Sequence, residues 1–567
     1  MSTHTSAAGD VSLPPARPGL DLYDTTLRDG TQREGVVLSV EDKLRVARRM
    51  DELAVAFIEG GWPGANPKDT EFFRRAADGE LALEHATLVA FGMTRAATRS
   101  AHEDPQLQAL LDARTDAVCL VGKSWGYHVD EALGVPRDEN LAMVADSVAH
   151  LRAEGRRVFF DAEHFFDGHA RDRAYALDVV TAAAEAGAEV VVLCDTNGGA
   201  MPWDTTPIVS DLVASLPCDV GLHFHDDGGC AVANSLLGIE AGAVHVQGTA
   251  NGLGERCGNA NIFTIMADLQ LKRGLSLIPP DRLERLTDVS HHVAELCNQA
   301  TPAVAPYVGH TAFSHKAGLH ASAMAKAPDM YQHIDPAEVG NRQRLVVSEL
   351  AGRSNILLKA KELGLDISDD EAREVLAEIK RREAEGWTYE AADASFELLL
   401  RRVTGRTPLE EEPFHSRHYR VSVAGGTEAR HRLADRTPGL TPPRGDEPAA
   451  ELDGDGPAEA ILAVEVGGVR RLGAGEGNGP VDALDHAFRN AVNGTWQQLD
   501  QVHLADYKVR ILEATAGTDA VTRVLVTSTD GHEVWDTVGV HANVVEASWL
   551  ALSDAYTHAI LRPTWTA

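Results

Sequence analysis

Eight short apolar segments alternate with amphipathic ones between about residues 20 and 275, and this alternation constrains the fold more than any other feature. The expected strands are 20–25, 55–60, 87–91, 116–121, 157–163, 189–194, 219–225 and 243–248. Strand and helix together repeat about every 30 residues, as in a closed parallel barrel. A doubly wound open sheet would show a G-x-G-x-x-G turn after its first strand, and none is present there. We therefore predict an α/β fold built on a (β/α)8 TIM barrel.

One amphipathic segment also carries the signals of a helix start. Ser39 precedes residues 40–54, and Asp42 stands three positions after it, as in a capping box. Leu44, Ala47 and Met50 then recur at helical spacing. We expect a helix here whose apolar stripe is buried.

The rest of the chain predicts several further segments. The polar start lacks an apolar signal core and is typical of a disordered tail. Helical, charged sequence follows the barrel, and then comes a stretch rich in Pro, Gly and charge. Expected strands at 460–466, 507–512 and 521–527 and helices at 480–493 and 543–560 indicate a smaller α+β domain. The predicted boundaries are 1–19 for the tail, 20–280 for the barrel, 281–425 for the helical subdomains, 426–457 for a disordered linker or insertion, and 458–567 for the C-terminal domain.

Charge and cysteine content exclude several classes of protein. The net charge is −33, from 85 acidic and 52 basic residues, which argues against nucleic-acid binding. No apolar run approaches the ~20 residues of a membrane span. Six cysteines without C-x-x-C spacing argue against a disulfide scaffold and fit a reducing cytoplasm.

Polar side chains cluster where the predicted strands end. Barrel enzymes carry their active sites at the carboxyl ends of the strands. We therefore expect one active site there, formed by residues that follow or end the first, second, fifth, sixth and seventh strands: Arg28, Asp29, Glu59, Glu163, Thr196, His223 and His225.

The seventh strand predicts a metal site. His223 and His225 stand two apart, so both imidazoles point to one face of the strand. Two neutral imidazoles supply half of a divalent-metal site. Asp29 would add a carboxylate, and the amide oxygen of Asn259 is a possible fourth ligand. This mixture of nitrogen and oxygen fits Mg²⁺, Mn²⁺ or Zn²⁺.

Such a site suits carbonyl chemistry. Four protein ligands leave two positions open on an octahedral ion, and a 2-oxo acid fits both through its carboxylate and keto oxygens. The ion would act as a Lewis acid on the keto group. Arg28 would stabilise a developing alkoxide, and Thr196 would hydrogen-bond the carboxylate of the substrate.

Other interpretations of the same residues stay open. A lone Arg-Asp pair is usually a surface ion pair, and most isolated His-x-His pairs bind no metal. Glu59 is either a catalyst or a structural partner for Arg28. The glycines of residues 252–258 are also explained by a turn. Cys194, Cys230 and Cys257 have no evident base beside them, so packing is the favoured role.

Five motifs, in order and spacing, resemble the DRE-TIM metallolyase superfamily. They are DTTLRDGTQREG (24–35), IEGGWPGANPKD (58–69), LCDTNGG (193–199), HFHDDGGCAVANSL (223–236) and GTANGLGERCGN (248–259). AFSHKAGLHASAMAK (312–326) is similar to the helical subdomain of the isopropylmalate, homocitrate and citramalate synthase branch. GEGNGPVDAL (475–484) and VGVHANVVEASWLAL (538–552) resemble its regulatory domain. The whole pattern looks closest to the long-form citramalate synthases, and the resemblance covers about residues 20–425 and 458–562.

The resemblance implies roles for individual residues. Asp29, His223 and His225 match the metal ligands, with Asn259 as the fourth, and Arg28 and Glu59 match the signature arginine and glutamate. Glu163 and Thr196 match residues near the acetyl group and the 2-oxo acid. His320, with Tyr331 nearby, matches a histidine that reaches into the partner subunit of a homodimer. One departure is Gly60-Gly61-Trp62-Pro63, where many relatives carry Gly-Phe-Pro, so the wall of the substrate pocket is expected to differ.

The reaction that the resemblance implies is an acyltransferase-type Claisen condensation of acetyl-CoA with pyruvate. The base would be His320, acting with Tyr331 or Glu163. Isoleucine is the expected effector of the C-terminal domain. The carboxylate of isoleucine would bind free backbone N–H groups where two helices begin, near residues 480 and 543. These helix starts follow the glycine-bearing segments 473–479 and 539–543.

Three alternatives remain. In the first, the enzyme uses another 2-oxo acid in place of pyruvate: 2-oxoisovalerate, as in isopropylmalate synthases, or 2-oxoglutarate, as in homocitrate synthases. The second is a lyase, against which the 475–552 region argues because simple lyases lack that domain. The third is a non-catalytic amino-acid sensor, which the intact set of candidate ligands disfavours.

Overall fold

The computed structural model describes residues 19–315, 330–345, 352–390, 392–423, 458–512 and 520–565, with Ala323 and Ala327. The predicted disordered segments, 1–19 and 426–457, lie outside the described residues except for Gly19, and His320 also lies outside them. The chain forms two compact units. We call Met1–Phe313 with Gln332–Gln343 the barrel unit, and Ser314–Tyr331 with Arg344–Ala567 the C-terminal unit.

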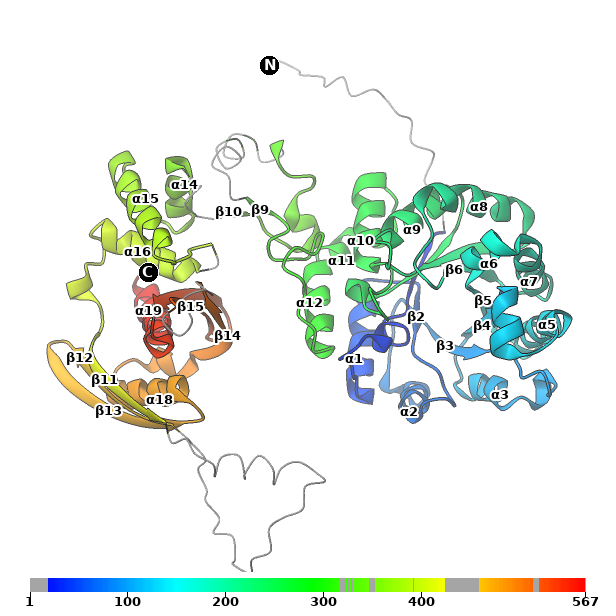
Figure 1. Ribbon diagram of the computed structural model, residues 1–567, viewed down its shortest axis with the longest axis horizontal. Helices are drawn as coiled ribbons and strands as arrows, with labels where there is room; N and C mark the ends of the chain where they lie inside the picture. The colour runs from blue at the N-terminus through cyan, green and yellow to red at the C-terminus, as the bar shows by residue number, and fades with distance from the viewer. Residues whose placement is uncertain are drawn as a thin grey trace, which may run out of the picture. The chain divides into compact units, whose positions relative to one another are not determined.

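The barrel unit contains the predicted TIM barrel (Figure 1). Its strands are parallel, follow chain order and close where β8 pairs with β1. They are β1 (Asp21–Asp24), β2 (Phe57–Glu59), β3 (Thr87–Met93), β4 (Ala117–Lys123), β5 (Arg157–Glu163), β6 (Val190–Asp195), β7 (Asp219–Phe224) and β8 (His245–Gly248). All eight lie at the expected positions, which confirms the prediction of the fold class.

Helices cover the outside of this barrel (Figure 1). The first, α1 (Val40–Asp51), begins with the predicted capping box, in which Ser39 and Asp42 cap each other's backbone N–H groups. Leu44, Ala47 and Met50 are fully buried, so the predicted stripe faces the strands. The other main helices are α2 (Pro67–Arg75), α3 (Pro105–Asp112), α5 (Arg137–Ala153), α7 (Arg173–Glu185), α8 (Pro202–Ser215), α9 (Ala231–Glu240), α10 (Ile262–Ala267), α11 (Pro280–Leu283) and α12 (Leu286–Leu296).

Side chains fill the barrel interior. Tyr23, Phe57 and Phe159 pack around His245, with ring centroids 5.0, 6.0 and 5.3 Å from the imidazole. This apolar layer also includes Val89, Ala117 and Val192. Because the interior is a packed core, chemistry is confined to the carboxyl ends of the strands.

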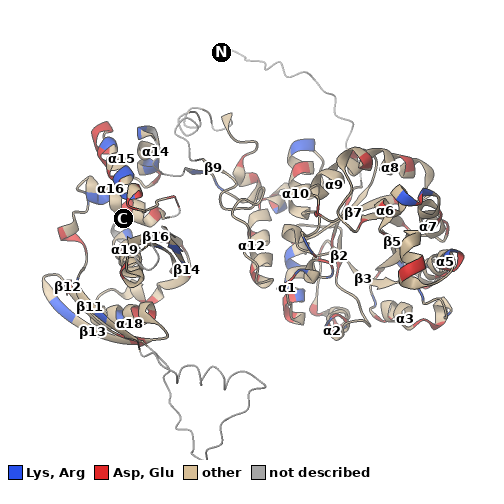
Figure 2. Cartoon of the chain, viewed as in Figure 1, with Lys and Arg blue, Asp and Glu red and all other residues tan. Residues whose placement is uncertain are grey.

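The C-terminal unit contains helices and two antiparallel sheets. The helices α14 (Arg353–Glu362), α15 (Asp369–Ala384) and α16 (Asp393–Val403) precede two repeats of three strands and a helix. The first repeat is β11 (His415–Val423), β12 (Ala458–Val466), β13 (Val469–Gly477) and α18 (Pro480–Val492); the second is β14 (His503–Ile511), β15 (Thr522–Thr529), β16 (Val534–His541) and α19 (Val544–Trp565). The two repeats form an α+β domain, but β11 lies before residue 458, where that domain was expected to begin. Figure 2 marks acidic and basic residues on the helices of this unit, as on α15.

Three of these strands, β11, β13 and β16, were not predicted from the sequence. β13 contains Gly473, Gly475 and Gly477, which weaken the pattern of a strand. The structure explains them, because a Cβ on Gly473 would lie 2.0 Å from the carbonyl oxygen of Ala487 in α18. The glycines therefore allow close contact between strand and helix.

The helix start near 543 does not offer its N–H groups as expected. The side chain of Asn543 accepts hydrogen bonds from the N–H groups of Val545 and Glu546, at 2.8 and 3.4 Å. These two donors are satisfied within the chain, and we do not place an effector on them. No described helix has the length and apolar character that crossing a membrane requires, and all six cysteines are free thiols.

Candidate active site and metal centre

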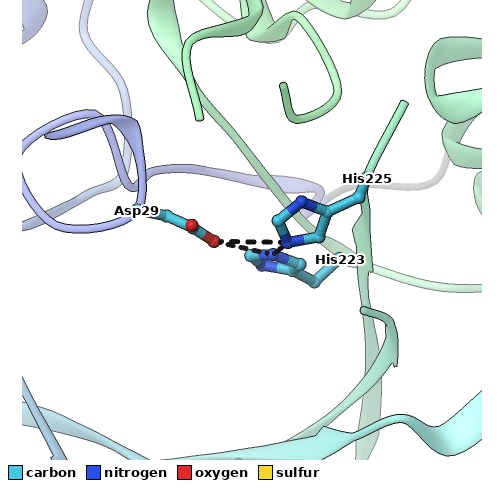
Figure 3. Close-up of side chains that lie close together, drawn as sticks. All are labelled: Asp29, His223 and His225. Atoms are coloured by element: carbon cyan, nitrogen blue, oxygen red, sulfur yellow. Dashed lines mark hydrogen bonds and ion pairs between the residues drawn. The ribbon is translucent and has the colours of Figure 1, made fainter. Parts of the chain in front are cut away.

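Asp29, His223 and His225 meet at the mouth of the barrel (Figure 3). Asp29 Oδ2 lies 3.1 Å from His223 Nε2 and 3.6 Å from His225 Nε2, and the two imidazole nitrogens are 3.4 Å apart. All three side chains are buried. The sequence prediction that these residues converge is therefore correct in geometry.

The environment of the three side chains fits a cation among them. Burial opposes the charge on Asp29, but the Arg28 guanidinium and the two imidazoles outweigh it and hold the carboxyl pKa far below its usual range. Burial also opposes the charged form of His223, yet Asp29 raises its pKa. Burial and His223 lower the pKa of His225 to about 4. At neutral pH, His225 therefore presents a neutral imidazole, the form that binds metal.

The distances suit a divalent ion. Bonds of about 2.1 Å and right angles between ligands place neighbouring ligand atoms about 3 Å apart. The three separations of 3.1, 3.4 and 3.6 Å are close to this value. A carboxylate with two imidazoles is also a chemically suitable donor set for Mg²⁺, Mn²⁺ or Zn²⁺.

Asn259 completes the group. Its Nδ2 lies 3.0 Å from Asp29 Oδ2 and 3.1 Å from His223 Nε2, while its Oδ1 is buried without a partner among the described residues. Rotation of the amide by 180° would exchange the two atoms and turn the oxygen towards the three ligands. Asn259 therefore fits the role of fourth ligand. Gly254 makes room for it, because a Cβ there would lie 1.9 Å from Oδ1.

Arg28 lies beside the three ligands and is held on several sides. Its Nε donates to Glu59 at 2.6 Å, and its Nη1 is 3.3 Å from Asp29. Nη2 is 3.9 Å from Asp161, and the guanidinium lies 4.0 Å from the centre of the Phe91 ring. Burial disfavours the charge, but the three carboxylates outweigh it and raise the pKa of Arg28, so the guanidinium stays protonated.

The carboxylate of Glu59 accepts hydrogen bonds from three side chains. Tyr23 Oη donates to Oε1 at 2.7 Å, while Thr25 Oγ1 and Arg28 Nε donate to Oε2 at 2.5 and 2.6 Å. The side chain is fully buried. Both carboxylate oxygens are therefore engaged within the protein, and the one shared with Arg28 fixes the orientation of the guanidinium.

Glu163 and Thr196 also lie at the mouth of the barrel. Glu163 ends β5 and forms an ion pair with Lys123, which ends β4. Thr196 follows β6, and its hydroxyl accepts a hydrogen bond from the His164 N–H at 2.9 Å. That hydroxyl retains its own proton for donation to a ligand.

The roles of the two remaining site residues, His320 and Tyr331, stay predictions. His320 lies outside the described residues. Tyr331 belongs to the C-terminal unit, and its side chain is 40% exposed. Their predicted roles rest on the resemblance alone.

Sequence reasoning missed four polar residues of the barrel mouth: Lys123, Asp161, Gln247 and Gln106. Three of them lie at or near the ends of β4, β5 and β8, where the rule that located Glu59 would also have pointed. Gln106 opens α3 and accepts a hydrogen bond from Trp62 Nε1 at 2.9 Å. Nothing in the local sequence marks it.

Trp62 forms a wall next to Arg28. Its ring packs edge-on against Phe91, with centroids 5.4 Å apart. The Arg28 guanidinium lies over the Phe91 ring. The Trp62 N–H of the backbone donates to Asp69 at 2.9 Å, which anchors the loop after β2. The departure from Gly-Phe-Pro therefore places a large rigid side chain beside the site.

Family models match three parts of the chain. Residues 19–293 match the model described as HMGL-like, and residues 307–386 match the homocitrate synthase post-HMGL domain-like model. Residues 390–560 match the LeuA allosteric (dimerisation) domain. The last match begins before α16, which also packs with the sheets of the C-terminal unit.

Curated relatives match over nearly the full length. The (R)-citramalate synthase of Streptomyces coelicolor is 50% identical and covers 95% of this chain and 96% of its own. That of Synechocystis sp. is 47% identical and covers 96% of each chain. A probable 2-isopropylmalate synthase of Methanopyrus kandleri is 31% identical, over 89% of this chain and 91% of its own. The chain therefore belongs to the (R)-citramalate synthase family, with an HMGL-like barrel and a LeuA-type C-terminal domain.

Proposed function

We propose that this protein condenses acetyl-CoA with pyruvate to give (R)-citramalate and CoA, with a divalent metal held by Asp29, His223 and His225. The observation that carries the proposal is the 50% identity to the (R)-citramalate synthase of Streptomyces coelicolor over 95% of the chain. The converging ligand atoms at the barrel mouth support it.

The residues of the site have complementary tasks in this proposal. A divalent ion held by the three side chains, with Asn259 as fourth ligand, would supply Lewis-acid polarisation of the keto group. Arg28 donates to the keto oxygen as negative charge develops on it. Thr196 donates its hydroxyl proton to the carboxylate of pyruvate.

The condensation forms one carbon–carbon bond. A base removes a proton from the methyl group of acetyl-CoA, and the resulting carbanion attacks the keto carbon of pyruvate. Water then cleaves the thioester and releases CoA. We assign the proton transfer to His320, acting with Tyr331 or with Glu163, which lies at the barrel mouth in an ion pair with Lys123.

We assign Glu59 a positioning role. Its two carboxylate oxygens already accept three hydrogen bonds, from Tyr23, Thr25 and Arg28, so both are engaged within the protein. Glu59 instead orients the guanidinium of Arg28 towards the reacting keto oxygen. This role is one of the two that the sequence leaves open for Glu59.

The wall formed by Trp62 and Phe91 favours a small 2-oxo acid. Phe91 lies against the guanidinium that would bind the keto oxygen, and Trp62 packs edge-on against Phe91. A methyl group needs less room there than the isopropyl group of 2-oxoisovalerate. The probable 2-isopropylmalate synthase that matches this chain is also the more distant relative, at 31% identity.

Three further properties belong to the proposal. The match to a dimerisation domain supports a homodimer, with His320 supplied to the partner's barrel. Isoleucine is proposed as the inhibitor, because citramalate would enter isoleucine biosynthesis. The expected location is the cytoplasm.

The proposal is tested with purified full-length protein, acetyl-CoA, pyruvate and Mn²⁺. Chromatography on a chiral phase should identify (R)-citramalate in amounts equal to the CoA released. His225→Ala should lose both products together with bound metal. Inhibition by isoleucine, but not by leucine or lysine, is expected. Absence of citramalate, or inhibition by leucine alone, would contradict the proposal.

A further inference from the structure

We propose that Gln247 and Asp161 form a buried positioning relay that holds His223 in the tautomer required for metal binding. The inference rests on the proposed metal site and extends it to two residues that touch neither the metal nor a substrate. The relay runs from Asp161 in β5 through Gln247 in β8 to His223 in β7.

Two hydrogen bonds define the relay. Gln247 Oε1 lies 2.7 Å from His223 Nδ1, and Gln247 Nε2 lies 2.9 Å from Asp161 Oδ1. His223 and Gln247 are register partners on adjacent strands, whereas β5 and β8 are not neighbours in the barrel. The glutamine therefore reaches across the barrel interior to the carboxylate. All three residues are at most 5% exposed, so water does not substitute for either bond.

The chemistry of the three groups fixes the direction of both bonds. An ionised carboxylate only accepts hydrogen bonds, so the NH₂ group of Gln247 must face Asp161. The carbonyl oxygen of Gln247 then faces His223 and accepts a hydrogen bond from it. Nδ1 of His223 consequently carries a proton.

A proton on Nδ1 leaves the lone pair of a neutral His223 on Nε2. This is the atom that faces Asp29 and His225 at 3.1 and 3.4 Å. The opposite tautomer would place a proton where a metal ion must bind. Hydrogen-bond partners of this kind orient metal-binding histidines and raise their affinity for the ion.

Asp161 also connects the relay to Arg28. Its second oxygen, Oδ2, is 3.9 Å from Arg28 Nη2, while Oδ1 is used by Gln247. One carboxylate therefore lies between the guanidinium and the glutamine. Burial raises the pKa of Asp161 to about 6, while His223 and Arg28 favour its charged form, so the carboxylate that orients Gln247 is ionised above that pH.

The test measures Mn²⁺ binding to metal-free protein, with free Mn²⁺ counted by electron paramagnetic resonance. Gln247→Met keeps the size of the side chain but removes both hydrogen bonds, and it should raise the Kd for Mn²⁺ by about 10–100-fold. The paired change Gln247→Glu with Asp161→Asn reverses donor and acceptor between the two positions. The new carboxylate still accepts from His223 Nδ1, so the pair should bind Mn²⁺ nearly as tightly as the wild type.

Two controls separate the relay from other causes. Gln270→Met makes the same substitution at a glutamine whose amide bonds the backbone of Ile278, at 3.1 and 3.2 Å, and should leave the Kd unchanged. His223→Ala should abolish tight binding. If it does not, the proposed metal site is itself wrong. If His223→Ala loses the ion while Gln247→Met binds it like the wild type, the relay alone is wrong.

The paired variant keeps the test decisive if Gln247→Met does not fold. A folded pair that binds Mn²⁺ at least about 10-fold more weakly than the wild type would overturn the relay, because its hydrogen bonds are conserved. Restored binding in the pair, measured on protein with wild-type circular dichroism, would support it. A packing role for Gln247 would not predict that restoration.

Discussion

In the proposed reaction, Arg28 is the residue that stabilises negative charge on the keto oxygen. Its guanidinium bonds Glu59 through Nε, approaches Asp29 and Asp161 through the other two nitrogens, and rests on Phe91. A single planar group makes all four contacts. The geometry of the group, and not its charge alone, is therefore matched to the site.

Arg28→Lys should reduce kcat by about 10²–10³-fold, because an ammonium cannot pair with Glu59 and also donate to the keto oxygen. Steady-state CoA release at saturating substrates measures the effect. Metal content, checked in parallel, should stay at the wild-type level. A rate near that of the wild type would mean that Arg28 is only structural.

Asp24 makes the barrel sensitive to pH. It is fully buried, its Oδ2 has no partner among the described residues, and burial raises its pKa to about 7. The folded state thus keeps this proton up to about pH 7, whereas the unfolded state loses it near pH 4. Stability therefore falls as the pH rises from about 4 to about 7 and does not change further above that.

Asp24→Asn should remove this dependence, since an amide does not titrate. Relative to the wild type, the variant should gain roughly 2–3 kcal/mol between about pH 5 and pH 7. Thermal unfolding of both proteins across this range measures the difference in Tm. Parallel curves of Tm against pH would contradict the raised pKa.

The loop after β8 shows how an element sets the position of a ligand. Gly254 has a φ of +153°, and a Cβ there would meet the side chain of Asn259. The turn predicted for these glycines and the ligand role predicted for Asn259 are therefore connected, because the same loop provides both. The glycine leaves the space in which the amide lies.

Gly254→Ala should weaken Mn²⁺ binding by about 10-fold or more, because the new methyl group displaces Asn259. Gly79→Ala is the matched control, since Gly79 also has a positive φ, +90°, but no atom lies within 4 Å of its would-be Cβ. Both variants carry backbone strain, but only Gly254→Ala places a methyl group against Asn259, so only that variant should lose metal affinity. Equal affinities in the two variants would exclude a role for Asn259.

The sequence predicted those helices, strands and site residues that depend on local patterns along the chain. All eight barrel strands and the capping box of α1 follow from periodicity and cap chemistry, and His223 and His225 follow from their spacing on one strand. The relay was missed because Asp161 and Gln247 meet only when the barrel closes. β13 was missed because its glycines serve contact with α18, which local propensity does not encode.

In the C-terminal unit, the helices α14–α16 share a core with β16 of the second sheet. Ile356, Val375 and Phe396, from α14, α15 and α16, pack with Val538 and Val540 of β16. Arg402 in α16 also bonds Asp554 in α19 at 2.9 Å. The helices that precede residue 426 therefore depend on the strands that follow residue 457.

Deletion of residues 427–567 should therefore damage more than regulation. The cut exposes the core surface of α14–α16, and each apolar side chain that loses its cover forfeits about 1.5–3 kcal/mol. Size-exclusion chromatography with light scattering should detect aggregates or a large loss of solubility. A monodisperse truncated protein with the Tm of the full chain would show that the two parts fold independently.

Release of CoA from acetyl-CoA, measured against a panel of 2-oxo acids before and after removal of metal, tests the central claim most directly. The account predicts the highest kcat/KM with pyruvate, lower values with 2-oxoisovalerate and 2-oxoglutarate, loss of the reaction with a chelator, and recovery with Mn²⁺ or Mg²⁺. Preference for a larger 2-oxo acid, or undiminished CoA release from metal-free protein, would contradict it.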